Sequence, residues 1–271
     1  MPELPEVETT VRGLARLLDG QTLTRVTVNR PDLRRPFPPG LVQALTGAQV
    51  TGLSRRAKYG LIHTARGHAM VFHLGMSGRW RIDPEEDERH DHLVLETAGH
   101  RFALNDPRRF GSVDLLLASE LDAWPAFAAL GPEPLGPELT AAWLRERTRG
   151  RKPAIKQMLL DQRVVAGLGN IYVCEALWRA RIDPRKAGGK VTAPQLERLV
   201  PAIRDVLEQS IRDGGSTLRD FAQPDGELGY FATRFDVYGR TDQPCHRDDG
   251  GTIRRLVQGG RSTWYCPRCQ R

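Results

Sequence analysis

The sequence predicts an α+β protein in which a β-sandwich or barrel is followed by a helical region and a short strand region that bears cysteines. Three observations carry this prediction. Residues 22–117 consist of short alternating apolar segments separated by turn residues, as in an all-β unit. Between residues 155 and 212 the apolar positions recur at helical spacing instead. The last three cysteines all lie within residues 245–271, which is typical of a metal site more than of a disulfide framework.

Length and charge narrow the class of protein. The chain of 271 residues is long enough for about two domains with real cores. A net charge of +7 and a pI near 9.6 favour an acidic partner, and nucleic acid fits best because Lys and Arg are spread along the chain. The alternative is a basic housekeeping enzyme. No apolar run reaches the ~18 residues of a membrane span and the N-terminus is no signal peptide, so we expect a cytoplasmic protein.

A first helix is expected ahead of the strands. Pro5 suits its first turn and Gly20 ends it. Its apolar residues recur at helical spacing at Val7, Val11, Leu14 and Leu18. One face of this helix should be buried and should anchor the N-terminus.

The residues before this helix could carry chemistry. Removal of Met1 would leave Pro2 as an N-terminal secondary amine, and an α-amino group has a pKa near ~8, so much of it can be neutral. A neutral amine can form a Schiff base with a sugar aldehyde carbon. Glu3 places a carboxylate beside it that could move protons. The alternative is a disordered N-terminus that simply opens a helix.

The remaining elements follow in order. Residues 70–74, 92–95 and 113–116 exemplify the expected strands. Residues 131–139 are rich in Pro and Gly and are expected to form a linker.

Helices are expected after this linker. One helix should include Gln162, and the next should carry Cys174 as a buried small hydrophobe. The longest should run from Thr192 to Arg212, with Thr192 and Gln195 as a capping-box pattern and two glycines after its end.

Four segments have both a functional and a structural interpretation. Asn170 follows a Gly-Leu-Gly loop at an expected N-cap, where backbone N–H groups could bind a phosphate, or the loop is a plain turn between helices. Residues 105–111 (NDPRRFG) could offer arginine to a base edge and phenylalanine to a base stack, or Phe110 lies in the core. Met76 is either an apolar wedge or a core residue. Lys58 either serves a phosphate or acid–base chemistry, or belongs to a solvated charge run.

The cysteines of the C-terminal region suggest zinc. Cys266 and Cys269 form a C-x2-C pair, whereas Cys245 lacks a second cysteine and has Asp248 three residues later. Zinc accepts Cys, His or Asp, so the fourth ligand could be Asp248 or His246. A metal-free hairpin is the alternative.

Together these segments resemble bacterial formamidopyrimidine-DNA glycosylases, also called 8-oxoguanine DNA glycosylases. The likeness covers almost the whole chain, and Leu4 with the PRRF segment favours this purine-specific branch over the related endonuclease VIII. The segments that carry it, in the family's order, are PELPEVE, RRAKYG, HLGMSG, NDPRRFG, VAGLGNIY, GGSTLRDF and VYGR followed by PC and YCPRCQ.

The resemblance implies a fold and a domain division. Residues 1–130 would form an N-terminal catalytic β-sandwich domain flanked by helices, and residues 131–150 a linker and the start of the helical domain. Residues 151–234 would form a helix–two-turns–helix domain with a lesion-capping loop, and residues 235–271 a zinc-finger-type β-hairpin. The capping loop corresponds to residues 216–230.

The resemblance also implies an activity. The protein would be a monomeric bifunctional DNA glycosylase and AP lyase of base excision repair. It would act on double-stranded DNA that contains oxidised purines or abasic sites, through a Schiff base followed by β,δ-elimination. A structural zinc ion would be its one cofactor.

Individual residues receive roles from the same resemblance. Pro2 would be the nucleophile, Glu3 the proton-transfer carboxylate, Lys58 a phosphate-binding residue that assists β-elimination, and Arg261 the finger arginine of δ-elimination. Met76, Arg108 and Phe110 would fill the gap left by the flipped nucleotide, with Arg108 facing the orphan cytosine. The backbone-binding residues would be His92, Arg151 and Asn170.

Two other functions compete with this interpretation. One is a glycosylase for oxidised pyrimidines. The other is a non-catalytic nucleic-acid binder that uses the helical domain and the finger alone, and such a protein has no use for a processed Pro2 and Glu3.

Overall fold

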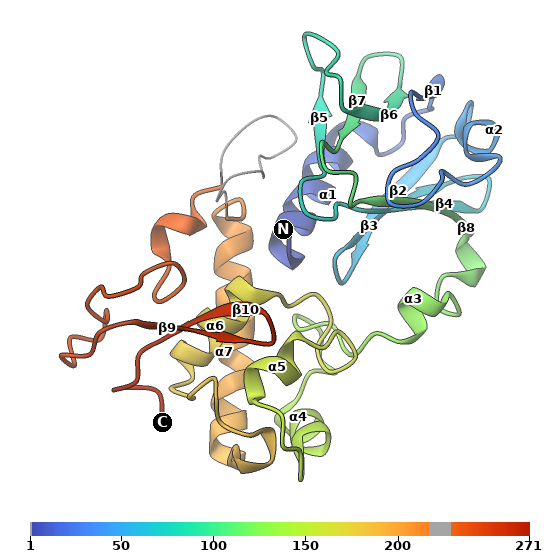
Figure 1. The fold of residues 1–271 in the computed structure, drawn as a ribbon. Coiled ribbons are helices and arrows are strands. Elements are labelled where there is room, and N and C mark those ends of the chain that lie inside the picture. The colour runs from blue at the N-terminus through green and yellow to red at the C-terminus, as the bar shows by residue number, and fades with distance from the viewer. Residues whose placement is uncertain (1, 217–228) are drawn as a thin grey trace. The chain divides into compact units, whose positions relative to one another are not determined.

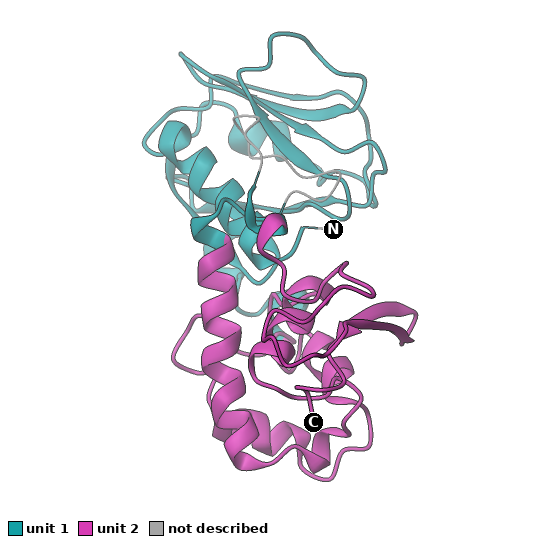
Figure 2. Ribbon diagram, turned by 90° about the vertical axis from the view of Figure 1, so that its left-hand side faces the viewer, with its two compact units in different colours: residues 1–128, 211–232 teal, residues 129–210, 233–271 magenta. Residues whose placement is uncertain are grey.

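The computed structural model describes residues 2–216 and 229–271 (Figure 1). Met1 lies outside the described residues, as does most of the expected capping loop. The chain divides into two compact units, residues 1–128 with 211–232 and residues 129–210 with 233–271 (Figure 2). The domain boundaries expected from the sequence stay predictions.

Unit 1 contains two antiparallel four-stranded sheets, as expected for a β-sandwich. The first has the order β1 (Arg25–Val28), β6 (Asp91–Glu96), β7 (Arg101–Asn105), β5 (Arg79–Ile82). The second has the order β2 (Val50–Arg56), β3 (Tyr59–Thr64), β4 (His68–His73), β8 (Ser112–Leu117). Apolar residues of both sheets share one core, in which the ring of Phe72 meets the ring of Trp80 edge-on at 5.5 Å.

Helix α1 (Leu4–Leu18) belongs to the same core. Its four expected apolar positions are all buried, so the helical periodicity of the N-terminal segment is confirmed. The short elements α2 (Leu41–Leu45), η1 (Ala118–Glu120) and α3 (Pro125–Ala128) complete the part of unit 1 before the linker.

Unit 2 is helical and ends in a two-stranded hairpin. Its helices are α4 (Ala141–Thr148), α5 (Ile155–Leu160), α6 (Asn170–Arg179), the greater part of α7 (Ala193–Arg212) and the 3-10 helix η2 (Gly188–Lys190). A further 3-10 helix, η3 (Phe231–Arg234), is divided between the two units. The hairpin pairs β9 (Arg254–Gln258) with β10 (Arg261–Tyr265), and β10 packs on α6. No helix of the described residues is long and apolar enough to cross a membrane.

The longest helix begins and ends where the sequence predicts. The Gln195 side chain accepts the Thr192 N–H at 3.1 Å, as in a capping box. After Arg212 the backbone turns through Gly214 and Gly215, whose φ values of 76° and 86° suit glycine.

Two local predictions are wrong in detail. Helix α5 ends at Leu160, and Gln162 instead supports the following turns, because its amide donates to Leu168 O (2.8 Å) and accepts the Gly167 N–H (2.9 Å). The N-cap of α6 is Gly169 rather than Asn170. The result is a helix, two turns and a helix.

Residues 131–139 contain no helix or strand, as expected of a linker. They are nevertheless fixed to α7, because Arg204 Nη2 donates to Gly136 O (3.0 Å) and Leu139 O (2.9 Å).

Candidate active site, loop pair and metal centre

Pro2 and Glu3 are buried at the first turn of α1. Glu3 is the N-cap residue: its side chain accepts the Glu6 N–H, and Glu6 Oε2 accepts the Glu3 N–H at 2.9 Å. Glu6 Oε1 in turn accepts both the N–H and the Oγ–H of Ser216, each at 2.8 Å. The N-terminal residues are therefore held in place, at the positive end of a helix dipole. The sequence gives no local signal for this role of Glu6, because Ser216 lies 210 residues away in the chain.

Lys58 lies in the two-residue turn between β2 and β3 and is only 8% exposed, unlike a solvated surface charge. Burial, followed by the positive charges of Lys58, Arg34 and Arg35, lowers the pKa of His73 to about 4. His73 is therefore neutral at pH 7, and its Nδ1 accepts the Gly75 N–H at 3.0 Å. The sequence offers no local signal for this neutral histidine beside the lysine.

Two loops of unit 1 carry the residues expected to enter DNA. Met76 is partly exposed, and Phe110 is 45% exposed, so neither lies in the core. The guanidinium of exposed Arg108 lies 4.8 Å from the centre of the Phe110 ring. His92, by contrast, is 4% exposed, and its Nε2 donates to Asp106 O at 3.0 Å.

The tip of the hairpin in unit 2 presents Arg261, which is exposed after the turn formed by Gly259 and Gly260. The neighbouring Ser262 O accepts Asn170 Nδ2 (2.9 Å) and Lys156 Nζ (3.0 Å). Lys156 is fully buried and also donates to Thr263 Oγ1 at 2.7 Å.

These contacts fasten the hairpin to α5 and α6. The structure thus brings Asn170 and Arg261 into one neighbourhood. Arg151 is exposed and lines a hollow of about 460 Å³, together with Arg147 and Arg163.

Cys245, Cys266, Cys269 and Asp249 offer ligand atoms that all lie within 4.8 Å of one another. The expected fourth ligands are therefore corrected. Asp248 is exposed and ends a turn in which its N–H donates to Cys245 O. Its backbone is left-handed, with φ 51°, and Asp249 reaches the thiols instead.

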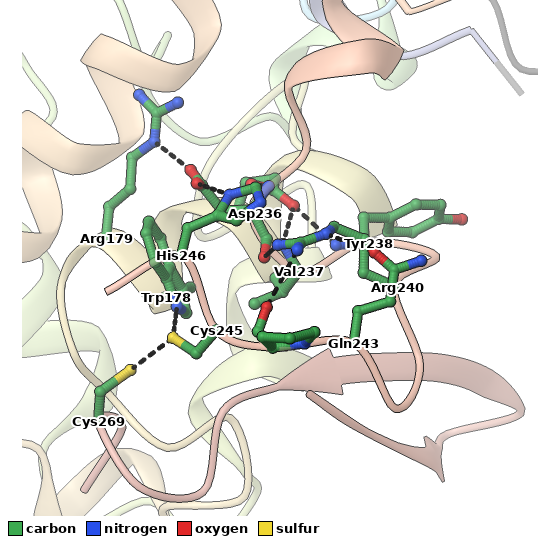
Figure 3. A network of polar contacts seen from close by, with 12 residues as sticks. Trp178, Arg179, Asp236, Val237, Tyr238, Arg240, Gln243, Cys245, His246 and Cys269 are labelled. Atoms are coloured by element: carbon green, nitrogen blue, oxygen red, sulfur yellow. Dashed lines mark hydrogen bonds and ion pairs between the residues drawn. The ribbon is translucent and has the colours of Figure 1, made fainter. Parts of the chain in front are cut away.

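His246 is not among these four residues either, and its Nδ1 pairs with Asp236 Oδ1 at 3.0 Å (Figure 3).

The four side chains fit a structural zinc ion. The sulfur atoms of Cys245 and Cys269 are 3.9 Å apart, and tetrahedral Zn–S bonds of about 2.3 Å require roughly 3.8 Å. Asp249 Oδ1 accepts the Gly251 N–H, whereas the buried Oδ2 has no hydrogen-bond partner among the described residues. Burial and the adjacent Cys266 thiol raise the pKa of Cys269 to about 12. A bound cation would satisfy the orphaned oxygen.

The metal cluster is supported by α6. Trp178 Nε1 donates to Cys245 Sγ at 3.4 Å (Figure 3). Cys174 is buried in the apolar core that Trp178 and Cys245 share, as expected for a small hydrophobe. Fully buried Glu175 accepts three backbone N–H groups, those of Asp236, Val237 and Tyr238. Burial raises the pKa of Glu175 to about 7. This carboxyl group, which the sequence pattern does not single out, fixes the segment that leads into the finger.

Three family descriptions match successive parts of the chain. Residues 1–113 match the formamidopyrimidine-DNA glycosylase N-terminal domain, and residues 130–222 match the formamidopyrimidine-DNA glycosylase H2TH domain. Residues 242–271 match the zinc finger found in FPG and IleRS. The matched segments follow the sheets, the helical region and the cysteine-bearing hairpin in order.

Similar proteins match over full length. The formamidopyrimidine-DNA glycosylase of Erythrobacter litoralis is 74% identical over 271 residues, which cover 100% of both chains. A structure of the Lactococcus lactis Fpg with DNA that contains an abasic site has a TM-score of 0.92, with 34% identity and 100% coverage of both chains. A structure of the same wild-type protein with DNA that contains N7-benzyl-Fapy-dG has a TM-score of 0.91, with 34% identity and the same coverage.

Proposed function

Because the chain belongs to the formamidopyrimidine-DNA glycosylase family, and is therefore a DNA glycosylase for damaged bases, we propose that it is also an AP lyase that excises oxidised purines. Its substrates would be 8-oxoguanine and formamidopyrimidines in duplex DNA, and its nucleophile would be Pro2. The observation that carries this proposal is the buried Pro2 at the capped start of α1. A positive helix end disfavours a protonated amine and so favours the nucleophilic form.

The first half of the reaction would exchange the base for the amine. The Pro2 nitrogen attacks C1′ of the sugar, and the bond from C1′ to the base breaks as the base takes up a proton. The nitrogen then loses its proton, the bond from C1′ to O4′ opens as O4′ is protonated, and an iminium ion remains. We assign these proton transfers to Glu3, which is fixed next to Pro2 by its bonds to Glu6.

The second half would cut the strand. The iminium ion acidifies the hydrogens on C2′, so loss of one proton expels the 3′ phosphate, and loss of a second proton, from C4′, expels the 5′ phosphate. Water then hydrolyses the imine and frees Pro2. Lys58 and Arg261 would stabilise the phosphates, because a cation lowers the energy of an anionic leaving group.

The DNA contacts would divide between the units. Met76, Arg108 and Phe110 would fill the space of the extruded nucleotide, because an extruded base leaves a gap in the stack. Asn170 and Arg151 would contact the backbone of the duplex. His92 is buried, so its part in DNA binding would pass through the Asp106 carbonyl that it contacts.

The zinc ion would have a structural role only. Cys245, Cys266, Cys269 and Asp249 would hold it, and it would join the base of the hairpin to the segment before β9. No step of the reaction passes through the metal.

Borohydride trapping tests the proposal. Borohydride reduces an iminium ion to a stable amine, so a duplex with one 8-oxoguanine opposite cytosine should crosslink to the protein, and mass mapping should place the crosslink on Pro2. Pro2→Gly should lose most strand cleavage but keep duplex binding. Tight binding without an adduct would favour the non-catalytic binder, and preferential excision of thymine glycol would favour the pyrimidine branch.

A further inference from the structure

We propose that Asp106 is a positioning residue that locks together the two loops carrying Met76, Arg108 and Phe110. This inference rests on the proposed insertion of these side chains into DNA. Asp106 itself would not contact DNA, because it is only 1% exposed. Its role is to set the geometry from which the exposed side chains enter the duplex.

The two loops, residues 74–78 and 106–111, are in direct backbone contact. A Cβ atom on Gly75 would lie 2.3 Å from the Phe110 carbonyl carbon, and one on Gly111 would lie 2.8 Å from His73 O. Within the first loop, Gly78 N–H donates to Leu74 O at 2.8 Å. Only glycine permits such an approach, so the chain has two positions at which a side chain would force the loops apart.

Asp106 supplies the polar contacts between these loops. Its Oδ1 accepts the Ser77 Oγ–H at 2.6 Å, and its Oδ2 accepts the Gly111 N–H at 2.8 Å. Ser77 Oγ also accepts the Arg108 N–H at 3.2 Å. One buried carboxyl group therefore connects the Met76 loop with the backbone on both sides of Phe110.

The backbone N–H and carbonyl of Asp106 are hydrogen-bonded as well. Its N–H donates to His90 O at 3.0 Å, and its carbonyl accepts the Arg109 N–H at 3.2 Å and His92 Nε2 at 3.0 Å. The turn forces Arg109 into the left-handed region, with φ 54°. Asp106 is thus held in place by β6 and the loop before it, so it fixes the position of the exposed tips of the two loops.

The side chains that project from the loops have few other supports. Arg108 lies over the Phe110 ring, and both are exposed. Ordering such side chains on binding costs free energy, and a preformed loop pair reduces that cost. A displacement of the loops by about 1 Å is enough to slow a positioned reaction by roughly 100-fold.

The central test is Asp106→Asn, which keeps the size of the side chain. An amide has a single acceptor oxygen: if that oxygen keeps the Gly111 N–H, the NH2 group faces Ser77 Oγ, and the Ser77 hydroxyl must turn from donor to acceptor while it also accepts the Arg108 N–H, so the hydrogen bonds that join the two loops are rearranged. Excision of 8-oxoguanine opposite cytosine should slow about 10- to 100-fold. Borohydride trapping on a duplex with a preformed abasic site, where no base has to be expelled, should change less than about threefold.

A double-mutant cycle separates positioning from general damage. In a background of Arg108→Ala and Phe110→Ala, the loops keep only Met76 of the three inserted side chains, so Asp106→Asn should slow excision by less than about threefold. Equal slowing in both backgrounds would overturn the proposal. Asp32→Asn is the matched control: it removes an exposed carboxylate 3.5 Å from Arg109 without touching the lock, and excision should stay unchanged.

The outcomes distinguish this inference from the proposed function. If the double variant Arg108→Ala, Phe110→Ala excises 8-oxoguanine at the native rate, the insertion role itself is wrong. If that variant is slow while Asp106→Asn is fast, only the positioning role of Asp106 is overturned. Loss of trapping on abasic DNA by Asp106→Asn would also overturn it, because the defect would then reach Pro2 chemistry.

Discussion

His73 gives a sharp test of the electrostatics beside Lys58. The ring is largely buried, and Lys58, Arg34 and Arg35 add positive charge around it, so its pKa falls to about 4 from an ordinary value of 6.5. We expect His73→Asn to remove this titration while keeping the local structure. The Asn oxygen can take over the acceptor role of Nδ1 toward the Gly75 N–H.

The magnitude follows from linkage. The folded pKa is depressed, so the unfolded chain binds the extra proton between pH 6.5 and pH 4, and stability is lost as the pH falls through this window. The difference between a pKa of 6.5 in the unfolded chain and about 4 in the folded one is worth roughly 3 kcal/mol when the window has been crossed, and about 2 kcal/mol at about pH 5.

The assay is urea unfolding of the wild type and His73→Asn at several pH values between about 4.5 and 7.5, followed by tryptophan fluorescence. The wild type should lose about 2 kcal/mol more than the variant on going from neutral pH to about pH 5. Glu175, whose pKa is raised to about 7, titrates in the opposite sense over the same range. Its contribution cancels when the two proteins are compared at each pH.

A parallel pH dependence in both proteins would refute the argument, as would a direct NMR titration of His73 with a midpoint near its ordinary value of 6.5. Either result would mean that water or a counter-ion reaches the ring and that its pKa is not depressed.

Further predictions concern the finger and the loops. Asp249→Cys should tighten zinc binding at least about tenfold, measured by competition with a chromophoric chelator, whereas Asp248→Asn should leave zinc binding unchanged. When cobalt replaces zinc, the charge-transfer absorption should have the intensity of three thiolates in the wild type and of four in Asp249→Cys. Arg261→Ala should slow the δ-elimination step, seen as accumulation of the β-elimination product on gels, with little effect on base release. Arg108→Ala should weaken discrimination of the opposite base by ~1–3 kcal/mol, measured as the ratio of excision rates opposite cytosine and adenine.

The sequence predicts well those elements whose determining residues lie close together in the chain. The periodicity of α1 and the capping pattern of Thr192 and Gln195 are both contained within a few turns of helix, and the structure keeps them. The short apolar segments between turn residues likewise predict the sandwich, because strands of both sheets contribute apolar residues to one shared core.

The misses have non-local causes. Asn170 follows the pattern of an N-cap, but its amide group donates to Ser262, 92 residues away in the chain. Asp106 sits in a noticeable motif, yet its importance depends on Ser77 and Gly111, which reach it only through the packing of two loops. Asp249 rather than Asp248 reaches the thiols because the backbone of Asp248 is left-handed, and the spacing from Cys245 does not reveal this conformation.

The anchoring of the hairpin explains how a carboxylate can replace a thiolate in its metal cluster. An oxygen ligand binds zinc less tightly than sulfur, so a cluster of this kind should hold the base of the finger less firmly. The tip has separate anchors, because Asn170 and the fully buried Lys156 bind Ser262 directly beside Arg261. Removing zinc with a chelator should therefore increase amide exchange around Cys245 and Cys266 while protection of Thr263 persists. Equal loss of protection at both ends would mean that the metal alone holds Arg261 in place.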